Sequence, residues 1–304
     1  MNHALGIDIG GTKIALGVVA EHGALLAQAA VATDPGLGFG SAIHRMGAAA
    51  RELLRTSGIP AGALAGVGMG CTGPVNPTTG VVDNPYTLPG WDGCNLVAAM
   101  SDELGLPAWL ENDADAAAYG EYHFGTGEKV ERLVMLTFGT GVGGAAVLHG
   151  RIYRGAGGGH PEPGHMLVSS DGPPCYCGCR GCVESYASGP AIAAAAAAIG
   201  LDSADALFAA GADHESARSV LMDTQQAVAA ATWGVLHSFL PDRIVLGGGL
   251  VEAHAAFFVN AARKAVNRAR LIDTSHVTVI AAKLGNHAGV IGAARWAIDQ
   301  RRGA

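Results

Sequence analysis

The chain has 304 residues, of which 49% are hydrophobic and 15% charged, and its formal net charge is −7. This length suffices for two domains of ordinary size, each with its own core. The acidic balance argues against a nucleic-acid backbone as the main partner. The sequence shows neither a membrane-spanning apolar run nor the charged and apolar regions of a secretion signal, so we expect a cytoplasmic protein without a membrane partner.

The first structural signal is a pair of short apolar segments joined by glycines. Residues 5–9 and 14–19 predict two strands of a hairpin, and the turn between them consists of Gly10, Gly11, Thr12 and Lys13. Its backbone N–H groups could face a phosphate, because glycine has no Cβ to prevent close approach. Asp8 could hold Mg²⁺ through water, and Lys13 could meet a phosphate charge. A plain β-turn explains the glycines equally well.

The following segment alternates helices and strands. Apolar spacing predicts a helix, a strand, a helix and a strand at 41–57, 64–69, 95–104 and 107–110. Ser41 suits the N-cap of the first helix. Residues 84–92 lack periodicity and are long for a simple connection, which favours a ligand-facing role.

Polar residues then follow the strand at 107–110. Asn112, Asp113 and Asp115 lie between it and a predicted helix at 116–124. Open α/β sheets bind their ligands at the carboxyl ends of strands. We therefore expect Asp113 to take part in chemistry, whereas Asp115 is interpreted as an N-cap.

A second glycine turn repeats the layout of the first. Predicted strands at 133–138 and 145–149 flank a turn that begins with Gly139, Thr140 and Gly141. Two such units, half a chain apart, predict a duplicated fold with one phosphate-facing turn in each half.

A third glycine turn follows a predicted strand at 243–246. Gly247 and Gly248 could let a flat group such as adenine lie against the backbone, but a loop leading into a helix at 255–269 is the alternative. The remaining predicted elements are helices at 190–199, 217–239 and 289–298 and a strand at 277–280.

A histidine and a cluster of cysteines predict a metal site. The expected ligands are His165, Cys175, Cys177 and Cys182. Three thiolates and one imidazole form the closed tetrahedral set of structural zinc. The loop is too rich in glycine and proline to hold its shape by burying apolar side chains. A bound metal would make Glu162 and Glu184 face one another and present both carboxylates to a polar ligand.

Two alternatives remain open for the cysteines. Four cysteines allow three patterns of two disulfides, but disulfides are typical of oxidising compartments, so zinc is favoured. Cys179 lies between the expected ligands and could replace one of them.

Together these motifs resemble the ROK family of sugar kinases, within the actin/hexokinase-like ATPase superfamily. The resemblance covers essentially the whole chain, and six motifs in one order carry it. They are Asp8-Ile9-Gly10-Gly11-Thr12-Lys13, Glu111-Asn112-Asp113-Ala114, Gly139-Thr140-Gly141-Val142-Gly143-Gly144, Glu162-Pro163-Gly164-His165, the cysteine loop through Glu184, and Gly247-Gly248-Gly249.

The resemblance implies transfer of a phosphoryl group from ATP to a hexose hydroxyl, usually that at C6 of glucose, with Asp113 as general base. The implied sugar-binding residues are Gly73, Asn84, Asn112, Asp113, Glu162, His165 and Glu184. His165 would bind zinc through one ring nitrogen and the sugar through the other. The implied Mg²⁺ and phosphate side is formed by Asp8, Thr12 and Thr140 with Gly10, Gly11, Lys13, Gly139 and Gly141, and the nucleotide-base side by Gly247 and Gly248.

The resemblance also implies the architecture. We expect two α/β domains, each similar to ribonuclease H, with a zinc-stapled loop at 160–184 and the active site in the cleft between the domains. The smaller domain would comprise residues 1–116 and the last helix, about 287–304, and the larger one residues 117–286. Closure around the sugar would exclude water, and a homodimer or homotetramer is expected.

One departure concerns the substrate. His160-Pro161-Glu162 resembles the fructokinase-like members of the family, so fructose, mannose and N-acetylated hexosamines are alternatives to glucose. A sugar-responsive repressor is a second possibility, but Asp8 opens the first strand and leaves no room for a helix-turn-helix ahead of it. A non-catalytic sugar-binding protein is the third, against which the intact Asp113 argues.

Overall fold

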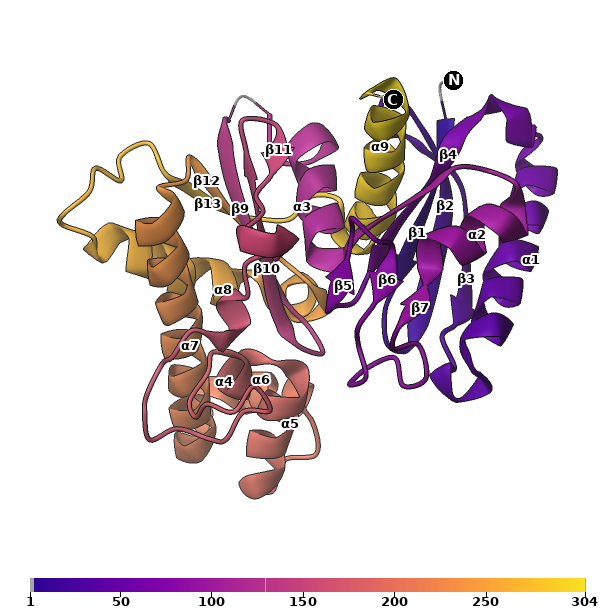
Figure 1. Ribbon diagram of the computed structural model, residues 1–304. Coiled ribbons are helices and arrows are strands. Elements are labelled where there is room, and N and C mark those ends of the chain that lie inside the picture. Colours follow the sequence, from indigo (N-terminus) through magenta and orange to yellow (C-terminus); the bar gives the residue numbers. More distant parts are fainter. Residues whose placement is uncertain (1–2, 129, 304) are drawn as a thin grey trace. The chain divides into compact units, whose positions relative to one another are not determined.

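The computed structural model describes residues 3–128 and 130–303 and divides the chain into two compact units (Figure 1). The first comprises Met1–Glu128, Ile152–His160 and Asn286–Ala304, and the second Lys129–Arg151 and Pro161–Gly285. Both are built from α-helices and a mixed β-sheet, which confirms the predicted α/β class. The domain limits at 116 and 286 stay a prediction, and the grouping by contacts assigns the helix that follows Asn112 to the first unit. Among the described residues, no helix has the length and apolar character needed to cross a membrane.

The sheet of the first unit has the strand order β3-β2-β1-β4-β8. Its strands are β1 (His3–Ile9), β2 (Lys13–Ala20), β3 (Leu25–Ala32), β4 (Leu64–Cys71) and β8 (Ala108–Asn112). The first two pair antiparallel, so the predicted hairpin is confirmed, while β4 runs parallel to both β1 and β8. The carboxyl ends of β1, β4 and β8 therefore lie at one edge of the sheet. Strand β3 was not predicted from the sequence, because four of its eight residues are alanines with a weak apolar signal and none of its residues is fully buried.

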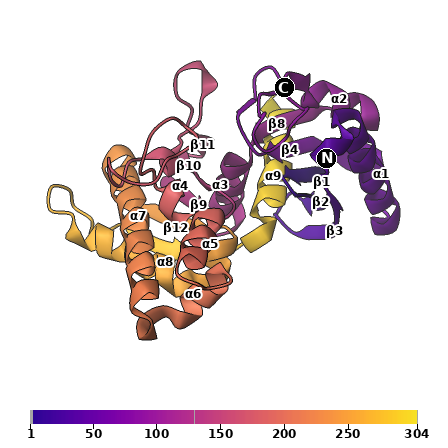
Figure 2. The same cartoon turned by 90° about the horizontal axis from the view of Figure 1, so that it is seen from below.

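Helices cover both faces of this sheet (Figures 1 and 2). They are α1 (Phe39–Ser57) and α2 (Leu96–Leu104) on one face, and α9 (Ala288–Gly303) with α3 (Asp113–Phe124) on the other. Glycines allow α9 to approach closely. A Cβ on Gly6 would lie 2.0 Å from the Val290 carbonyl oxygen, and one on Gly68 would lie 1.8 Å from that of Ala293. Side chains alternate along β1, so Asp8 faces the same side as Gly6, toward the beginning of α9.

Two predicted helix caps of the first unit are wrong. Helix α1 begins at Phe39 with Gly38 as its N-cap, two residues before Ser41. Helix α3 begins at Asp113, and its N-cap is Asn112, whose Oδ1 accepts hydrogen bonds from the backbone N–H groups of Ala114 and Asp115. Asp115 is therefore the third residue of the helix and not its cap. An asparagine directly before the first turn satisfies the same N–H groups that an aspartate cap would.

The aperiodic segment between β4 and α2 forms a small antiparallel sheet. Its strands are β5 (Val75–Asn76), β6 (Val81–Val82) and β7 (Cys94–Asn95). Strands of two residues are too short to show an alternation of apolar and polar side chains, so these three strands could not be predicted from such a pattern.

The sheet of the second unit has the order β11-β10-β9-β12-β13 and repeats that of the first. Its strands are β9 (Arg132–Phe138), β10 (Val142–Leu148), β11 (Arg151–Ile152), β12 (Arg243–Gly247) and β13 (Thr278–Ala281). Strands β9 and β10 form the second predicted hairpin, and β12 runs parallel to β9 and β13. In each sheet a glycine hairpin is followed by two parallel strands, as a duplicated fold requires.

The helices of the second unit are α4 (Glu184–Ala187), α5 (Gly189–Ala198), α6 (Ala204–Ala210), α7 (Glu215–Phe239) and α8 (Gly249–Arg268). Helices α7 and α8 share an apolar core with the sheet, in which the rings of Phe138 and Phe258 lie 5.0 Å apart. Single 3₁₀ turns complete the described elements of both units, at Pro35–Leu37, Ala61–Ala63, Ala156–Gly158, Pro163–His165, Gly211–Asp213 and Gly285–His287.

Candidate functional site

The carboxyl ends of β1, β4 and β8 bring two aspartates together. Asp8 is in register with Gly70 on the neighbouring strand. A Cβ on Gly70 would lie 3.5 Å from the Cα of Asp113. Because glycine occupies this position, the beginning of α3 can lie against β4, and Asp113 reaches the neighbourhood of Asp8.

The carboxyl groups of Asp8 and Asp113 both have raised pKa values. Burial, and then the charge of Asp113, raise the pKa of Asp8 to about 7, although the charge of Lys13 opposes the shift. Burial also raises the pKa of Asp113, against the hydrogen bonds from the Ala114 N–H and the Asn112 side chain. Asp113 is therefore a weaker acid than an exposed aspartate. Two close carboxylates with one lysine to offset them form a setting in which a divalent cation would be stabilised.

This arrangement predicts a pH-dependent stability. Asp8 binds its proton more tightly in the folded than in the unfolded protein, so the unfolding free energy should fall as pH rises from about 4 to about 7 and level off above. A shift of three pKa units corresponds to at most about 4 kcal/mol. In protein treated with EDTA, Asp8→Asn should remove the contribution of Asp8 to this decline, leave the smaller contribution of Asp113, and be more stable than wild type at pH 8. Urea unfolding at a series of pH values measures the effect, with exposed Asp102→Asn as control; parallel profiles for wild type and Asp8→Asn would contradict it.

Gly73 lies beside two other polar side chains of the first unit. A Cβ on Gly73 would lie 3.0 Å from Asn112 Nδ2 and 3.6 Å from His160 Nε2. The backbone at Gly73, the Asn112 amide and the His160 ring therefore surround one small space. The family resemblance implies the first two as sugar-binding residues, and His160, from the His160-Pro161-Glu162 motif, lies beside them.

All hydrogen-bonding groups of the Asn84 side chain have partners within the protein. Its side chain is buried, and Nδ2 donates to the Thr72 carbonyl oxygen and to Thr87 Oγ1, at 3.1 and 2.6 Å. Its Oδ1 accepts from the N–H groups of Tyr86 and Thr87 at 3.1 and 3.0 Å. An amide side chain has no further hydrogen-bonding groups. Asn84 thus fixes the loop after β6, and its predicted contact with a sugar would have to share or replace one of these bonds.

The structure also reveals an ion cluster that the sequence analysis missed. The guanidinium of Arg154 donates to the carboxylates of Glu111 and Asp115, whose side chains are 3% and 0% exposed. Burial lowers the pKa of Arg154 to about 10. The two acids flank Asn112 and Asp113 in the sequence. Acidic residues at both ends of a predicted strand–helix junction were the sequence feature that could have indicated a basic partner.

In the second unit, the hairpin turn between β9 and β10 is tied to Glu184. The Gly139 N–H closes the turn by donating to the Gly141 carbonyl oxygen at 2.9 Å, and Thr140 is exposed. Glu184 Oε2 accepts from the Val142 N–H at 2.8 Å and would lie 2.8 Å from a Cβ on Gly141. A side chain predicted to contact sugar therefore also holds the turn predicted to face phosphate.

The four predicted zinc ligands come together. One ligand atom from each of His165, Cys175, Cys177 and Cys182 lies within 4.8 Å of the other three. His165 Nδ1 is 3.5 Å from Cys175 Sγ, and the sulfurs of Cys177 and Cys182 are also 3.5 Å apart. Zinc–sulfur bonds of about 2.3 Å in a tetrahedron place ligands about 3.8 Å apart, so the group fits zinc. Cys179 lies outside this group, and all six cysteines carry free thiols.

The second ring nitrogen of His165 points at a tyrosine. His165 Nε2 is 3.3 Å from the hydroxyl of Tyr176, which is 66% exposed. Partial burial and the charges of Glu184 and Glu162 raise the pKa of this hydroxyl, so the two carboxylates lie close to it. The structure thus gathers Glu162, His165 and Glu184 around Tyr176, a residue that the sequence analysis did not single out.

The third glycine turn is shaped by internal packing. A Cβ on Gly247 would lie 2.5 Å from Met135 Cε, and one on Gly248 would lie 2.4 Å from the Phe138 carbonyl oxygen. Gly248 also has a φ of +91° and is the N-cap of α8. These two glycines are needed for the approach to β9, whereas Gly249 has open space around its Cα. A contact of Gly247 and Gly248 with adenine stays a prediction.

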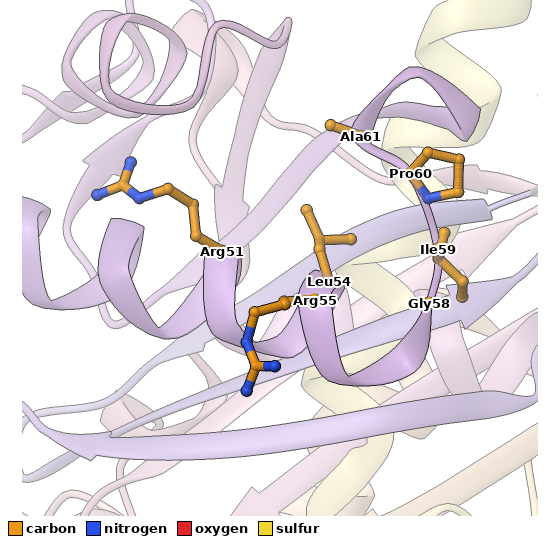
Figure 3. Close-up of a pocket in the computed structure, with 7 residues that line it drawn as sticks. All are labelled: Arg51, Leu54, Arg55, Gly58, Ile59, Pro60 and Ala61. Carbon is orange, nitrogen blue, oxygen red and sulfur yellow. The ribbon is translucent and has the colours of Figure 1, made fainter.

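A surface hollow of about 420 Å³ lies at the end of α1 (Figure 3), and its lining shares no residue with the groups described above. Its lining consists of Arg51, Leu54, Arg55, Gly58, Ile59, Pro60 and Ala61. Its two arginines donate to Glu103 and Glu52, at 2.7 and 2.6 Å. None of its residues was predicted to bind a ligand, and the hollow adds nothing to the site.

Comparisons with known proteins agree with this geometry. The chain is 32% identical over 307 residues to a glucokinase of Thermotoga maritima and 33% identical over 297 residues to an N-acetylmannosamine kinase of Salmonella arizonae; the alignments cover 95% of this chain and 95% and 96% of the relatives. A solved ROK family glucokinase of Streptomyces griseus, in complex with glucose and AMPPNP, has a TM-score of 0.79 and 30% identity, with 99% of this chain and all of that chain covered. The model of the ROK family matches residues 4–300, and the chain belongs to that family.

Proposed function

We propose that the protein is an ATP-dependent hexose kinase that converts glucose to glucose 6-phosphate. The observation that carries this proposal is the pairing of Asp8 and Asp113 at the carboxyl edge of the first sheet, directly beside the glycine turn of β1 and β2. One carboxylate is suited to a cation that accompanies phosphate and the other to a sugar hydroxyl. The similarity to glucokinases supports the choice of reaction.

In the proposed reaction, Asp113 accepts the proton of the attacking hydroxyl. The hydroxyl oxygen forms a bond to the γ-phosphorus of ATP while the bond from that phosphorus to the β–γ bridging oxygen breaks, and ADP leaves. The raised pKa of Asp113 makes it a stronger proton acceptor than an exposed aspartate once it is ionised. Asp113 Oδ1 accepts a hydrogen bond from the Ala114 N–H at 2.8 Å, which fixes the orientation of the carboxylate that would meet the sugar.

Two metal ions belong to this proposal. Mg²⁺ bound with ATP supplies neutralisation of phosphate charge, and Asp8 would hold it through water, with Thr12 and Thr140 on the phosphate side. Zn²⁺ would have a structural role at His165 and the three cysteines, because four protein ligands leave no open position for chemistry. The exposed turn residues of the two hairpins, Thr12 and Lys13 in the first and Thr140 and Gly141 in the second, would face the nucleotide phosphates.

The proposed sugar contacts are polar groups that the family resemblance implies. Asn112, Gly73, Glu162, His165 and Glu184 would bind hydroxyl groups. A site with several fixed hydrogen-bonding partners rejects a sugar that leaves some of them unpaired. His160 beside Gly73, and the similarity to an N-acetylmannosamine kinase, keep fructose, mannose and N-acetylated hexosamines as alternative substrates.

A coupled assay of ADP release over glucose, mannose, fructose, N-acetylglucosamine and N-acetylmannosamine tests this proposal. We expect release to depend on sugar and on Mg²⁺, with the highest kcat/KM for glucose. If another hexose has a higher kcat/KM than glucose, the proposed substrate is wrong but the proposed reaction stands. ADP release that no hexose accelerates would refute the kinase, and sugar binding without turnover would favour the non-catalytic sugar-binding protein. The proposed homo-oligomer is tested separately by light scattering on the eluted protein.

A further inference from the structure

A contribution to stability alone does not explain why Arg154, Glu111 and Asp115 form an ion cluster at this place in the fold. Arg154 is 22% exposed and lies 39 to 43 residues away in sequence from the two acids that it binds. A buried ion pair costs much of its attraction in desolvation, and apolar replacements are often equally stable. The role of this cluster therefore depends on which segments it holds together.

What it holds is the junction between β8 and α3. Glu111 is the next-to-last residue of the strand and Asp115 the third residue of the helix, with Asn112 and Asp113 between them. Successive residues of a helix are rotated by about 100°, so Asp113 and Asp115 point about 200° apart. Along the strand, Glu111 and Asn112 point to opposite faces. The two ends of the Arg154 fork thus bind the residue before Asn112 and the second residue after Asp113, one on each side of the junction.

The same arginine anchors the segment that leads to His160. Four of the five residues after Arg154 are glycines, and the Gly155 N–H donates to the Gly159 carbonyl oxygen at 2.7 Å to close a small loop. Glycines have no side chains with which to pack, so Arg154 supplies the side-chain attachment at the start of this loop. At the end of the loop, the His160 ring lies beside Gly73 and Asn112.

We propose that Arg154 is a positioning residue, which holds Asn112 and Asp113 in place through its two-pronged contact with Glu111 and Asp115 on either side of them. Its effect on turnover rests on the proposed kinase function, whereas its effect on the junction does not. A lysine keeps the charge but cannot bind both carboxylates in the geometry of a planar fork. Arg154→Lys should therefore loosen the junction and leave the rest of the unit unchanged.

Hydrogen exchange on the full-length protein measures the junction directly. The N–H groups of Ala114 and Asp115 bond to Asn112 Oδ1, and in Arg154→Lys they should exchange about tenfold faster or more. Amides of β2 should exchange as in wild type, as should all amides in the control Arg151→Lys, which alters an exposed arginine of β11. Wild-type exchange at Ala114 and Asp115 in Arg154→Lys would overturn the proposal, and so would an equal acceleration throughout the first unit.

Kinetics provide the second measurement. Arg154→Lys should lower kcat about 10- to 100-fold, as expected for a misplaced reacting group, with KM for ATP within about twofold. If Arg154→Lys does not fold, the charge-free variant Glu111→Gln/Arg154→Met/Asp115→Asn replaces it. If the amides of Ala114 and Asp115 exchange as slowly in that variant as in wild type, the proposal is refuted. A wild-type protein that phosphorylates no hexose would refute the kinase and leave the exchange result to decide the role of Arg154.

Discussion

Asp113→Asn is expected to lower kcat for hexose-dependent ADP formation by about 10²- to 10⁴-fold, the usual contribution of a general base. Asparagine has the size of aspartate, and its Oδ1 can still accept the 2.8 Å hydrogen bond from the Ala114 N–H. Helix α3 should keep its N-terminal geometry, because its cap is Asn112 and not Asp113. The loss should therefore reflect the missing proton acceptor and not a displaced helix.

The binding of sugar should separate from turnover in this variant. Sugar affinity, measured by titration calorimetry without ATP, should stay within a few-fold of wild type, since an amide can still bond to a hydroxyl. Asp102→Asn, an exposed aspartate on α2, is the matched control and should keep wild-type kcat. Turnover above a tenth of wild type in Asp113→Asn would exclude Asp113 as the base.

The pH dependence of the wild-type enzyme carries the same information. Asp113 can accept a proton only when it is ionised, so kcat/KM should fall as the pH falls through its pKa. Burial moves that pKa upward, so the decline should lie at higher pH than for an ordinary aspartate. Asp113→Asn should lose this acid limb.

The sequence predicted most of the strands and helices because their apolar residues repeat with clear periods. Both glycine hairpins follow from this pattern, and their repetition predicted the duplicated fold that the matching strand orders of the two sheets agree with. The errors have local causes. Helix α3 begins three residues early because Asn112 satisfies its first N–H groups, and three acidic or amide residues in a row offered competing caps. β3 was missed because alanines carry little apolar signal.

The candidate site was predictable where residue type and local spacing define the chemistry. Three cysteines and a histidine within 18 residues predicted the group that the structure brings together. Contacts between distant segments were not predictable. Arg154 stands in a glycine-rich segment, and only the fold gives it Glu111 and Asp115 as partners. The same holds for Glu184, whose bond to the Val142 N–H spans 42 residues.

A large loss of bound zinc is expected from a single substitution in the cysteine loop, and a neighbouring cysteine of the same loop provides the control. Cys177→Ser removes one ligand of the four-residue group, whereas Cys179→Ser changes an exposed cysteine two residues further on, outside that group. We expect metal analysis to find about one zinc ion per chain in wild type and in Cys179→Ser, and little in Cys177→Ser. Equal zinc in both variants, or none in wild type, would refute the proposed metal site.

Loss of the metal should weaken the binding of both substrates. Without zinc, His165 and Tyr176 lose their fixed positions, and KM for the sugar should rise about tenfold or more. Glu184 lies only two residues beyond Cys182 and bonds to Val142 beside the turn predicted to face phosphate, so KM for ATP should rise as well, by a smaller factor. Initial rates at varied glucose and at varied ATP measure both effects. A rise for sugar alone would show that Glu184 holds the hairpin turn without help from the metal, because the turn would then keep its shape when the cysteine loop loosens.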